Sequence, residues 1–181
     1  MHRFEKTGRA IDVWACAMVI ALTCVSAGAV TRSRNVYSNA TGVCQAALPA
    51  YEGQIRKRPL AIQNEGTASA FVSCSFAGTS TGVGGLRSIQ SLHLFADNNS
   101  AVSVSLTCTL VDSISGYTTA PTFITKTITL PANSKLVQLQ WYAGLDNDGD
   151  NFIWTVNTSC NLPVGVGLTA SYVEFAEDVG A

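Results

Sequence analysis

The chain has 181 residues, of which 47% are hydrophobic and only 13% are charged, and its formal net charge is −1. This length is that of one ordinary domain with a core of its own. Such sparse and balanced charge excludes the basic surface that nucleic acid or an anionic membrane would require, so neither is an expected partner.

The first 29 residues have the organisation of a secretory signal peptide. Three basic residues precede an uncharged apolar run (13–25), and the small residues Ala27, Gly28 and Ala29 follow it. The run is shorter than the roughly 20 residues of a transmembrane helix. We therefore expect export to the periplasm or beyond, a mature chain that begins at Val30, and no membrane span after cleavage of the leader.

The next segment, residues 30–57, shows no clear periodicity, and we interpret it as an N-terminal arm held by Cys44. From about residue 58 to 181, short alternating runs are separated by turn clusters, which is typical of antiparallel sheets. Strands are predicted over 59–63, 71–76, 88–96, 101–112, 122–130, 135–142, 152–160 and 168–177. About eight strands predict an all-β fold, an antiparallel two-sheet sandwich of the jelly-roll kind that forms one domain with the arm.

Four cysteines remain after the leader: Cys44, Cys74, Cys108 and Cys160. An even number in an exported domain favours two disulfides. Four cysteines permit three pairings, and we predict that Cys44 pairs with Cys74 and Cys108 with Cys160. Zinc is disfavoured because no two cysteines have C-x-x-C spacing and His93 is the only histidine of the mature chain.

Two further expectations concern strand faces and pairing. In 101–112 the apolar residues and Cys108 alternate with Ser and Thr, so Cys108 should point into the core. Phe152, Trp154, Val156 and Cys160 should share one inward face, which would place Cys160 within reach of Cys108. Strands 88–96 and 101–112 should pair as a hairpin through the polar turn at 97–100.

Exposed aromatic residues are the main lead to a ligand. Trp141 and Tyr142 are adjacent on one strand, so one of them faces outward, and an inward Trp141 makes Tyr142 the outward residue. Tyr117, in the loop at 116–117, is predicted to lie beside it. Exported β-sandwiches bind sugars by stacking them on such rings, which makes Tyr142 and Tyr117 the predicted ligand-binding residues for a cell-envelope or environmental glycan.

The run from Asp146 to Asn151 carries alternate carboxylates, at Asp146, Asp148 and Asp150, that can ligate calcium. The later positions of an EF-hand-like loop fail, because Asn151 replaces the expected glycine and Asn157 the expected glutamate. A solvated turn is the preferred interpretation, and calcium at these three residues is the alternative. No other cofactor is expected.

Residues suited to catalysis are few. No serine lies in a G-x-S-x-G elbow, and His93 is interpreted as a surface histidine on a strand. We predict no catalytic residue and therefore no enzyme.

Several strings, at 56–67, 71–75, 108–112, 159–163 and 177–180, together resemble a group of small exported bacterial proteins of no assigned function. The resemblance implies export and a bacterial source, and it supplies no site residue. The preferred hypothesis is an exported, non-catalytic binding module. The alternative is a structural or adhesive envelope protein, fimbrial or spore-coat-like, with an exposed sheet edge or groove for another protein chain. A second alternative is a small secreted hydrolase with a cleft around His93 or two carboxylates.

Overall fold

The computed structural model describes residues 30–79, 87–113 and 120–180. Its strands are β1 (Thr31–Asn39), β2 (Cys44–Ala46), β3 (Ile55–Arg58), β4 (Ala61–Asn64), β5 (Ala70–Ala77), β6 (Arg87–Asn98), β7 (Val104–Asp112), β8 (Thr122–Leu130), β9 (Val137–Tyr142), β10 (Phe152–Ile153), β11 (Thr155–Leu162) and β12 (Val166–Asp178). The short helices are α1 (Ala40–Val43), the 3₁₀ turn η2 (Pro49–Tyr51) and α2 (Ala143–Asp146). No helix in these ranges is long and apolar enough to cross a membrane. The predicted signal peptide lies outside the described residues.

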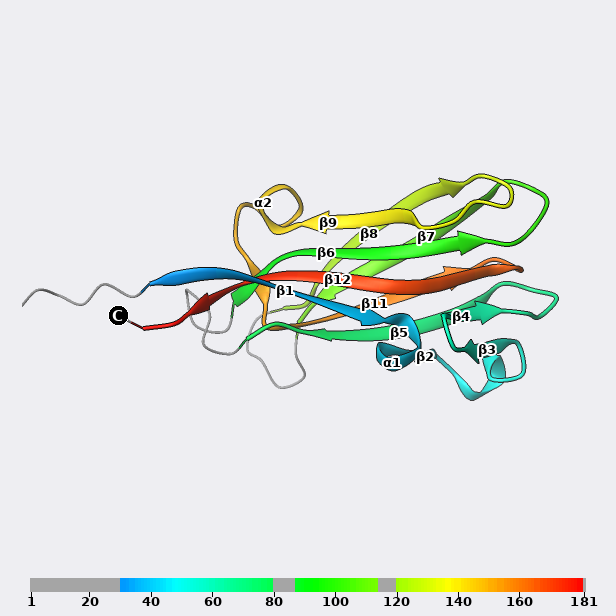
Figure 1. Ribbon diagram of the computed structural model, residues 1–181, viewed down its shortest axis with the longest axis horizontal. Helices are drawn as coiled ribbons and strands as arrows, with labels where there is room; N and C mark the ends of the chain where they lie inside the picture. Colours follow the sequence, from blue (N-terminus) through cyan, green and yellow to red (C-terminus); the bar gives the residue numbers. More distant parts are fainter. Residues whose placement is uncertain (1–29, 80–86, 114–119, 181) are drawn as a thin grey trace, which may run out of the picture.

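The strands form two packed antiparallel sheets, which confirms the predicted fold class (Figure 1). In the seven-stranded sheet the order is β10–β6–β12–β4–β3, with β1 also paired to β12 and β9 to β6. In the five-stranded sheet it is β2–β5–β11–β7–β8. The interleaved sets β4–β12–β6–β9 and β5–β11–β7–β8 have the strand order of a jelly roll. The described residues form four strands more than the eight predicted. Three of them, β1, β2 and β3, lie in the segment interpreted as an N-terminal arm, residues 30–57, together with α1 and η2.

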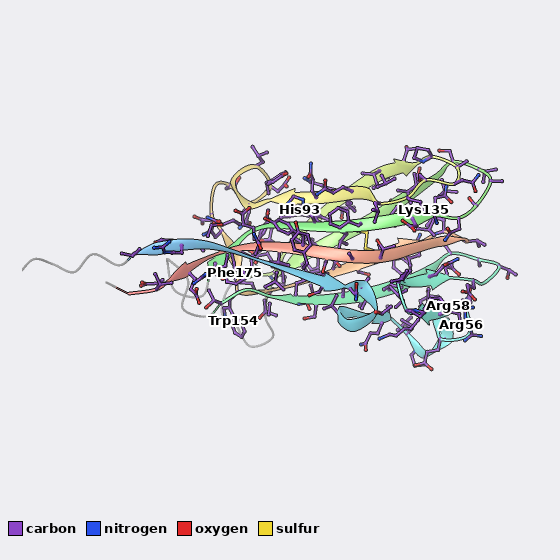
Figure 2. The ribbon with its side chains drawn as sticks, viewed as in Figure 1. Arg56, Arg58, His93, Lys135, Trp154 and Phe175 are labelled. Carbon is purple, nitrogen blue, oxygen red and sulfur yellow. A yellow bond between two sulfur atoms is a disulfide. The ribbon has the colours of Figure 1, made fainter. Side chains whose placement is uncertain are left out.

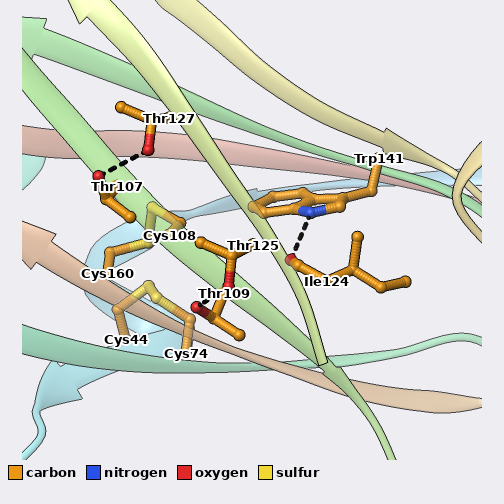
Figure 3. Close-up of a disulfide and its surroundings, with 10 residues drawn as sticks. All are labelled: Cys44, Cys74, Thr107, Cys108, Thr109, Ile124, Thr125, Thr127, Trp141 and Cys160. Atoms are coloured by element: carbon orange, nitrogen blue, oxygen red, sulfur yellow. Dashed lines mark hydrogen bonds between the residues drawn. A yellow bond between two sulfur atoms is a disulfide. The ribbon is translucent and has the colours of Figure 1, made fainter. Parts of the chain in front are cut away.

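Alternating apolar side chains of both sheets fill the core. Leu92 and Leu94 of β6 and Leu139 and Trp141 of β9 point into it from the seven-stranded sheet, each 2% exposed or less. The Trp141 indole Nε1 donates a hydrogen bond of 3.0 Å to the carbonyl oxygen of Ile124, so the ring is buried without an unpaired donor (Figure 3). With Trp141 inward, Tyr142 faces outward, as predicted.

Both predicted disulfides are present, Cys44–Cys74 and Cys108–Cys160 (Figure 3). Each joins residues directly opposite each other on neighbouring strands, β2 with β5 and β7 with β11. All four cysteines are at most 3% exposed, so the bridges lie on the inner face of the five-stranded sheet. Disulfides persist in oxidising, extracytoplasmic compartments, which is consistent with the expected export.

The predicted hairpin between residues 88–96 and 101–112 is wrong. β6 pairs with β12, β9 and β10 in one sheet, whereas β7 pairs with β11 and β8 in the other. β6 and β7 each have one apolar face to bury. The chain passes from one sheet to the other between them, so that the two apolar faces meet in the core, instead of folding back within one sheet. The polar residues at 97–100 form an arch between the sheets and not a hairpin turn.

Asn98 holds this arch in place. The side chain is fully buried, and its Nδ2 donates to the carbonyl oxygens of Val102 (2.8 Å), Pro131 (2.9 Å) and Leu130 (3.2 Å). Its Oδ1 accepts from the backbone N–H of Ser100 at 3.0 Å. One amide therefore joins the β6–β7 arch to the β8–β9 arch.

Asn64 repeats this arrangement where β4 leads into β5. It is also fully buried, its Nδ2 donates to the carbonyl oxygens of Ala68 and Leu162 at 2.8 Å, and its Oδ1 accepts from the N–H of Gly66 at 2.9 Å. Leu162 begins the β11–β12 arch. All four arches gather at one end of the sandwich, and the described chain ends at the other (Figure 1).

The predicted strand over 152–160 is divided at Trp154. Phe152 and Ile153 pair with β6 in the seven-stranded sheet, whereas Thr155 and the residues after it pair with β5 in the five-stranded sheet. Trp154 is the bend between the sheets and is only half-buried. Val156 and Cys160 do share the inner face, as expected.

Candidate functional site

A row of aromatic rings crosses the outward face of the seven-stranded sheet, and we call it the tyrosine face: Tyr37, Tyr172, His93 and Tyr142. Tyr37 of β1 is directly opposite Tyr172 of β12, which is directly opposite His93 of β6. Ring centroids are 4.8 Å apart for Tyr37 and Tyr172, 5.0 Å for Tyr172 and His93, and 5.3 Å for His93 and Tyr142 of β9. Four strands thus build one continuous aromatic surface.

The rings differ in exposure. Tyr37 is 71% exposed and Tyr142 37%, while Tyr172 is half-buried. His93 is only 7% exposed, because the edges of Tyr172 and Tyr142 meet it at interplanar angles of 78° and 88°. The interpretation of His93 as a surface histidine is therefore wrong: it faces outward from its strand, and the two tyrosines cover it.

A hydrogen-bonded chain runs beside the rings, on the same outward face. His93 Nδ1 contacts the Nε2 of Gln138, and His93 Nε2 lies 3.1 Å from the Oγ of Ser91. Ser91 Oγ donates to Glu174 Oε2 at 3.4 Å, and Ser33 Oγ donates to Glu174 Oε1 at 2.8 Å. A neutral imidazole with its proton on Nε2 satisfies both of its contacts. This network fixes the ring on which the tyrosines pack.

Burial sets the direction of two pKa values in the tyrosine face. Desolvation lowers the pKa of His93, and the Glu174 carboxylate opposes that shift. Desolvation, followed by the negative charge of Glu174, raises the pKa of the Tyr172 hydroxyl. Both groups are therefore uncharged near neutral pH, and the charged group beside these rings is the Glu174 carboxylate.

Polar groups border the rings. The Tyr142 hydroxyl donates to Gln140 Oε1 at 3.0 Å, and Gln140 lies directly opposite His93. Asn35 of β1 lies directly opposite Glu174, two positions along β12 from Tyr172. Figure 2 places His93 midway along the sandwich, away from Arg56 and Arg58 at the arch end. The arrangement can stack an uncharged, partly apolar ring and bind its polar edge.

Sequence reasoning identified one member of this site and missed the others. Tyr142 is outward and exposed, as predicted, and its ring meets that of His93, which in turn meets Tyr172. Tyr117 lies outside the described residues, so its predicted place beside Tyr142 stays a prediction. Tyr37 was missed because 31–39 is polar on both faces and shows no strand periodicity. The outward position of Tyr172 was readable from the alternation of Ser171 and Val173, which are buried.

The predicted calcium loop is partly engaged in other contacts. Asp146 Oδ2 forms an ion pair of 2.7 Å with Lys126 Nζ and accepts from the N–H of Tyr142 at 2.8 Å. Asp148 and Asp150 are exposed. Across the described ranges, no three His, Cys, Asp or Glu side chains come together as metal ligands. Calcium at Asp146, Asp148 and Asp150 stays an untested alternative.

The surroundings of His93 do not resemble a hydrolytic centre. Ser91 donates to Glu174 instead of giving its proton to the imidazole, and the ring is covered by Tyr172 and Tyr142. A base that activates a nucleophile must accept the proton of that nucleophile in an accessible cleft. This geometry favours a positioning role for His93 under the aromatic surface.

The chain matches no protein-family model and no curated protein, and the resemblance to small exported bacterial proteins stays a prediction. Solved structures match it at low similarity. The Podospora anserina GH26-CBM35 β-(1,4)-mannanase is 9% identical, with 78% of this chain and 28% of that chain covered and a TM-score of 0.39. The chain thus spans little more than a quarter of that enzyme.

Two further matches are to carbohydrate-binding modules. One, from work on CBM4 structure and function, is 11% identical, with 81% of this chain and 84% of that chain covered and a TM-score of 0.34. The other, from work on the promiscuous specificity of carbohydrate-binding modules of the β-sandwich superfamily, is 10% identical, with coverage of 86% and 56% and a TM-score of 0.38. Similarity at this level carries no functional inference.

Proposed function

We propose that this protein is an exported, non-catalytic module that binds an uncharged glycan on its tyrosine face. The observation that carries the proposal is the row of three tyrosines from three separate strands, packed with His93 into one outward surface. The C–H faces of a pyranose ring stack on aromatic rings, and adjacent amides hydrogen-bond its hydroxyls. Gln140 and Asn35 occupy the positions for the second task.

The absence of charge on the outermost rings favours a neutral ligand. Tyr37 and Tyr142 are the most exposed rings, and the carboxylate of Glu174 is engaged by Ser33 and Ser91. Because the charge beside the rings is negative, an anionic sugar would be repelled there.

Affinity gel electrophoresis against a soluble β-glucan, a galactomannan and a xylan tests the proposal. The wild-type chain should be retarded by at least one polymer, and Tyr37→Ala should weaken that binding about tenfold, because the loss of a stacking contact costs on the order of 1.4 kcal/mol. Tyr37→Phe should keep most of the affinity. Leu60→Ala, at a residue that is 76% exposed on β3–β4, is the matched control.

Equal retardation of wild type and Tyr37→Ala by a bound polymer would contradict the tyrosine face as the site. Absence of retardation by all three polymers would instead favour the second candidate, a structural or adhesive envelope protein. That candidate is supported by β1, which among the described residues pairs on one side only and leaves an edge to which another strand can add.

A further inference from the structure

The outward face of the five-stranded sheet carries no charged side chain within the described residues, and we call it the hydroxyl face. Its residues are Gln45, Phe71, Ser73, Ser75, Ala77, Ser105, Thr107, Thr109, Val111, Phe123, Thr125, Thr127, Thr129, Thr155, Asn157, Ser159 and Asn161. Surfaces of soluble domains normally mix charges of both signs. A sheet face that carries only hydroxyl, amide and a few apolar side chains departs from that pattern.

A hollow of about 470 Å³ lies in this face, across β2, β5, β11 and β7. Strand pairing places Gln45 opposite Ser73, Ser73 opposite Ser159, and Ser75 opposite Asn157. With neighbouring strands about 4.8 Å apart, four strands give the hollow a length of roughly 15 Å. This size falls within the range of ligand pockets.

The polar groups of the hollow have unused hydrogen-bonding capacity. In the described part of the chain, the side chains of Gln45, Ser73, Ser75, Asn157 and Ser159 make no hydrogen bond to another protein group. Beside the hollow, two pairs of hydroxyls on the same face satisfy each other, as shown in Figure 3: Thr107 with Thr127 at 2.8 Å and Thr109 with Thr125 at 2.7 Å. The hollow itself is lined by five polar side chains whose hydrogen-bonding capacity no protein group uses.

We propose that this hollow is a second binding site, for an extended neutral polysaccharide that lies across the strands. Hydroxyls and amides both donate and accept, which matches the hydroxyls of sugars. Val43 and Val111 line the hollow as apolar contacts for C–H groups. The lack of charge on the face matches an uncharged chain and gives no partner to a nucleic acid or an acidic polymer.

The tyrosine face and the hydroxyl face are the outer surfaces of the two packed sheets, so they point in opposite directions (Figure 1). A molecule that binds glycan on both would bridge two polysaccharide chains, and binding at two sites raises the overall avidity. The protein would then cross-link polysaccharides instead of binding a single polysaccharide chain.

The test removes one site at a time. In a Tyr37→Ala/Tyr142→Ala background, binding to at least one of the three polymers, the β-glucan, the galactomannan or the xylan, should persist. Adding Ser75→Arg, which places a bulky charge in the hollow, should weaken this remaining binding at least tenfold. Thr129→Arg is the matched control, because Thr129 is exposed on the same face and does not line the hollow. The wild-type chain should raise the viscosity of the bound polymer, and Ser75→Arg alone should not.

Two results would overturn the second site. One is that the double tyrosine variant binds none of the three polymers, or binds one of them equally with and without Ser75→Arg. The other is that sedimentation shows a wild-type dimer that Ser75→Arg dissociates without any loss of polymer binding, which would assign the hollow to a second copy of this chain. Thermal unfolding of each variant shows whether its fold is retained.

Discussion

Asn98 shows how much of this fold depends on single buried amides. Its side chain contacts four backbone groups in two segments of the chain, 100–102 and 130–131. Asn98→Ala would leave those groups buried and unpaired, and each such group costs about 1–3 kcal/mol when unsatisfied. We predict a loss of about 3 kcal/mol in the free energy of unfolding, measured by urea denaturation. Asn99→Ala, at an exposed neighbour, should change it by less than about 0.5 kcal/mol.

At the same scale, His93 gives the fold a defined pH dependence. Its pKa is lowered in the folded state, chiefly by burial, so between the folded and unfolded pKa values the unfolded chain binds more protons. The contribution of His93 to the free energy of unfolding is therefore complete above pH 6.5, the ordinary pKa of histidine, and is lost as the pH falls toward the lower pKa of the folded state. His93→Gln should flatten the melting temperature between pH 7 and 5, and an unchanged slope would contradict the assignment of a neutral imidazole.

At the scale of elements, the two disulfides reinforce only one of the two sheets. They join β2 to β5 and β7 to β11, over sequence separations of 30 and 52 residues. A chain-entropy treatment assigns about 4 kcal/mol to loops of these lengths. The double variant Cys108→Ala/Cys160→Ala should lose about that much stability in urea. Peptide mapping without reduction checks the pairing, and a peptide that links Cys44 to Cys160 would contradict it.

The strand pattern was predictable wherever one face is buried and the other is wet. β7, β9 and β11 show that alternation, and the predicted inward positions of Cys108 and Cys160 permitted the disulfide between them without requiring it. The pairing of β6 with β7 was not predictable, because a polar link such as 97–100 serves a hairpin or an arch equally well. Asn98 decides between them through contacts with Leu130 and Pro131, which are distant in sequence.

At the scale of the whole molecule, both candidate surfaces come from strand order. Tyr37, His93 and Tyr172 are spread over 136 positions of the chain and meet only because β1, β12 and β6 are neighbours. The same holds for Gln45 and Asn157 across β2, β5 and β11. Alternation identified Tyr142 as outward from its own strand, but the partners of an outward side chain lie on other strands, which local sequence does not specify.

The pairing of β1 with β12 determines how the domain responds to mechanical load. Thr31 is directly opposite Asp178, so both ends of the described sandwich lie at the same end of one antiparallel ladder (Figure 1). Tension that separates them acts across the strands and opens the ladder one pair at a time. β1 is attached on one side, whereas β12 is also held by β6, so β1 detaches first. Peeling then stops at Cys44, whose disulfide to Cys74 transfers the force to the covalently joined sheet. Detachment of β1 also removes Tyr37, so strain on the chain ends would dismantle the tyrosine face before the core opens.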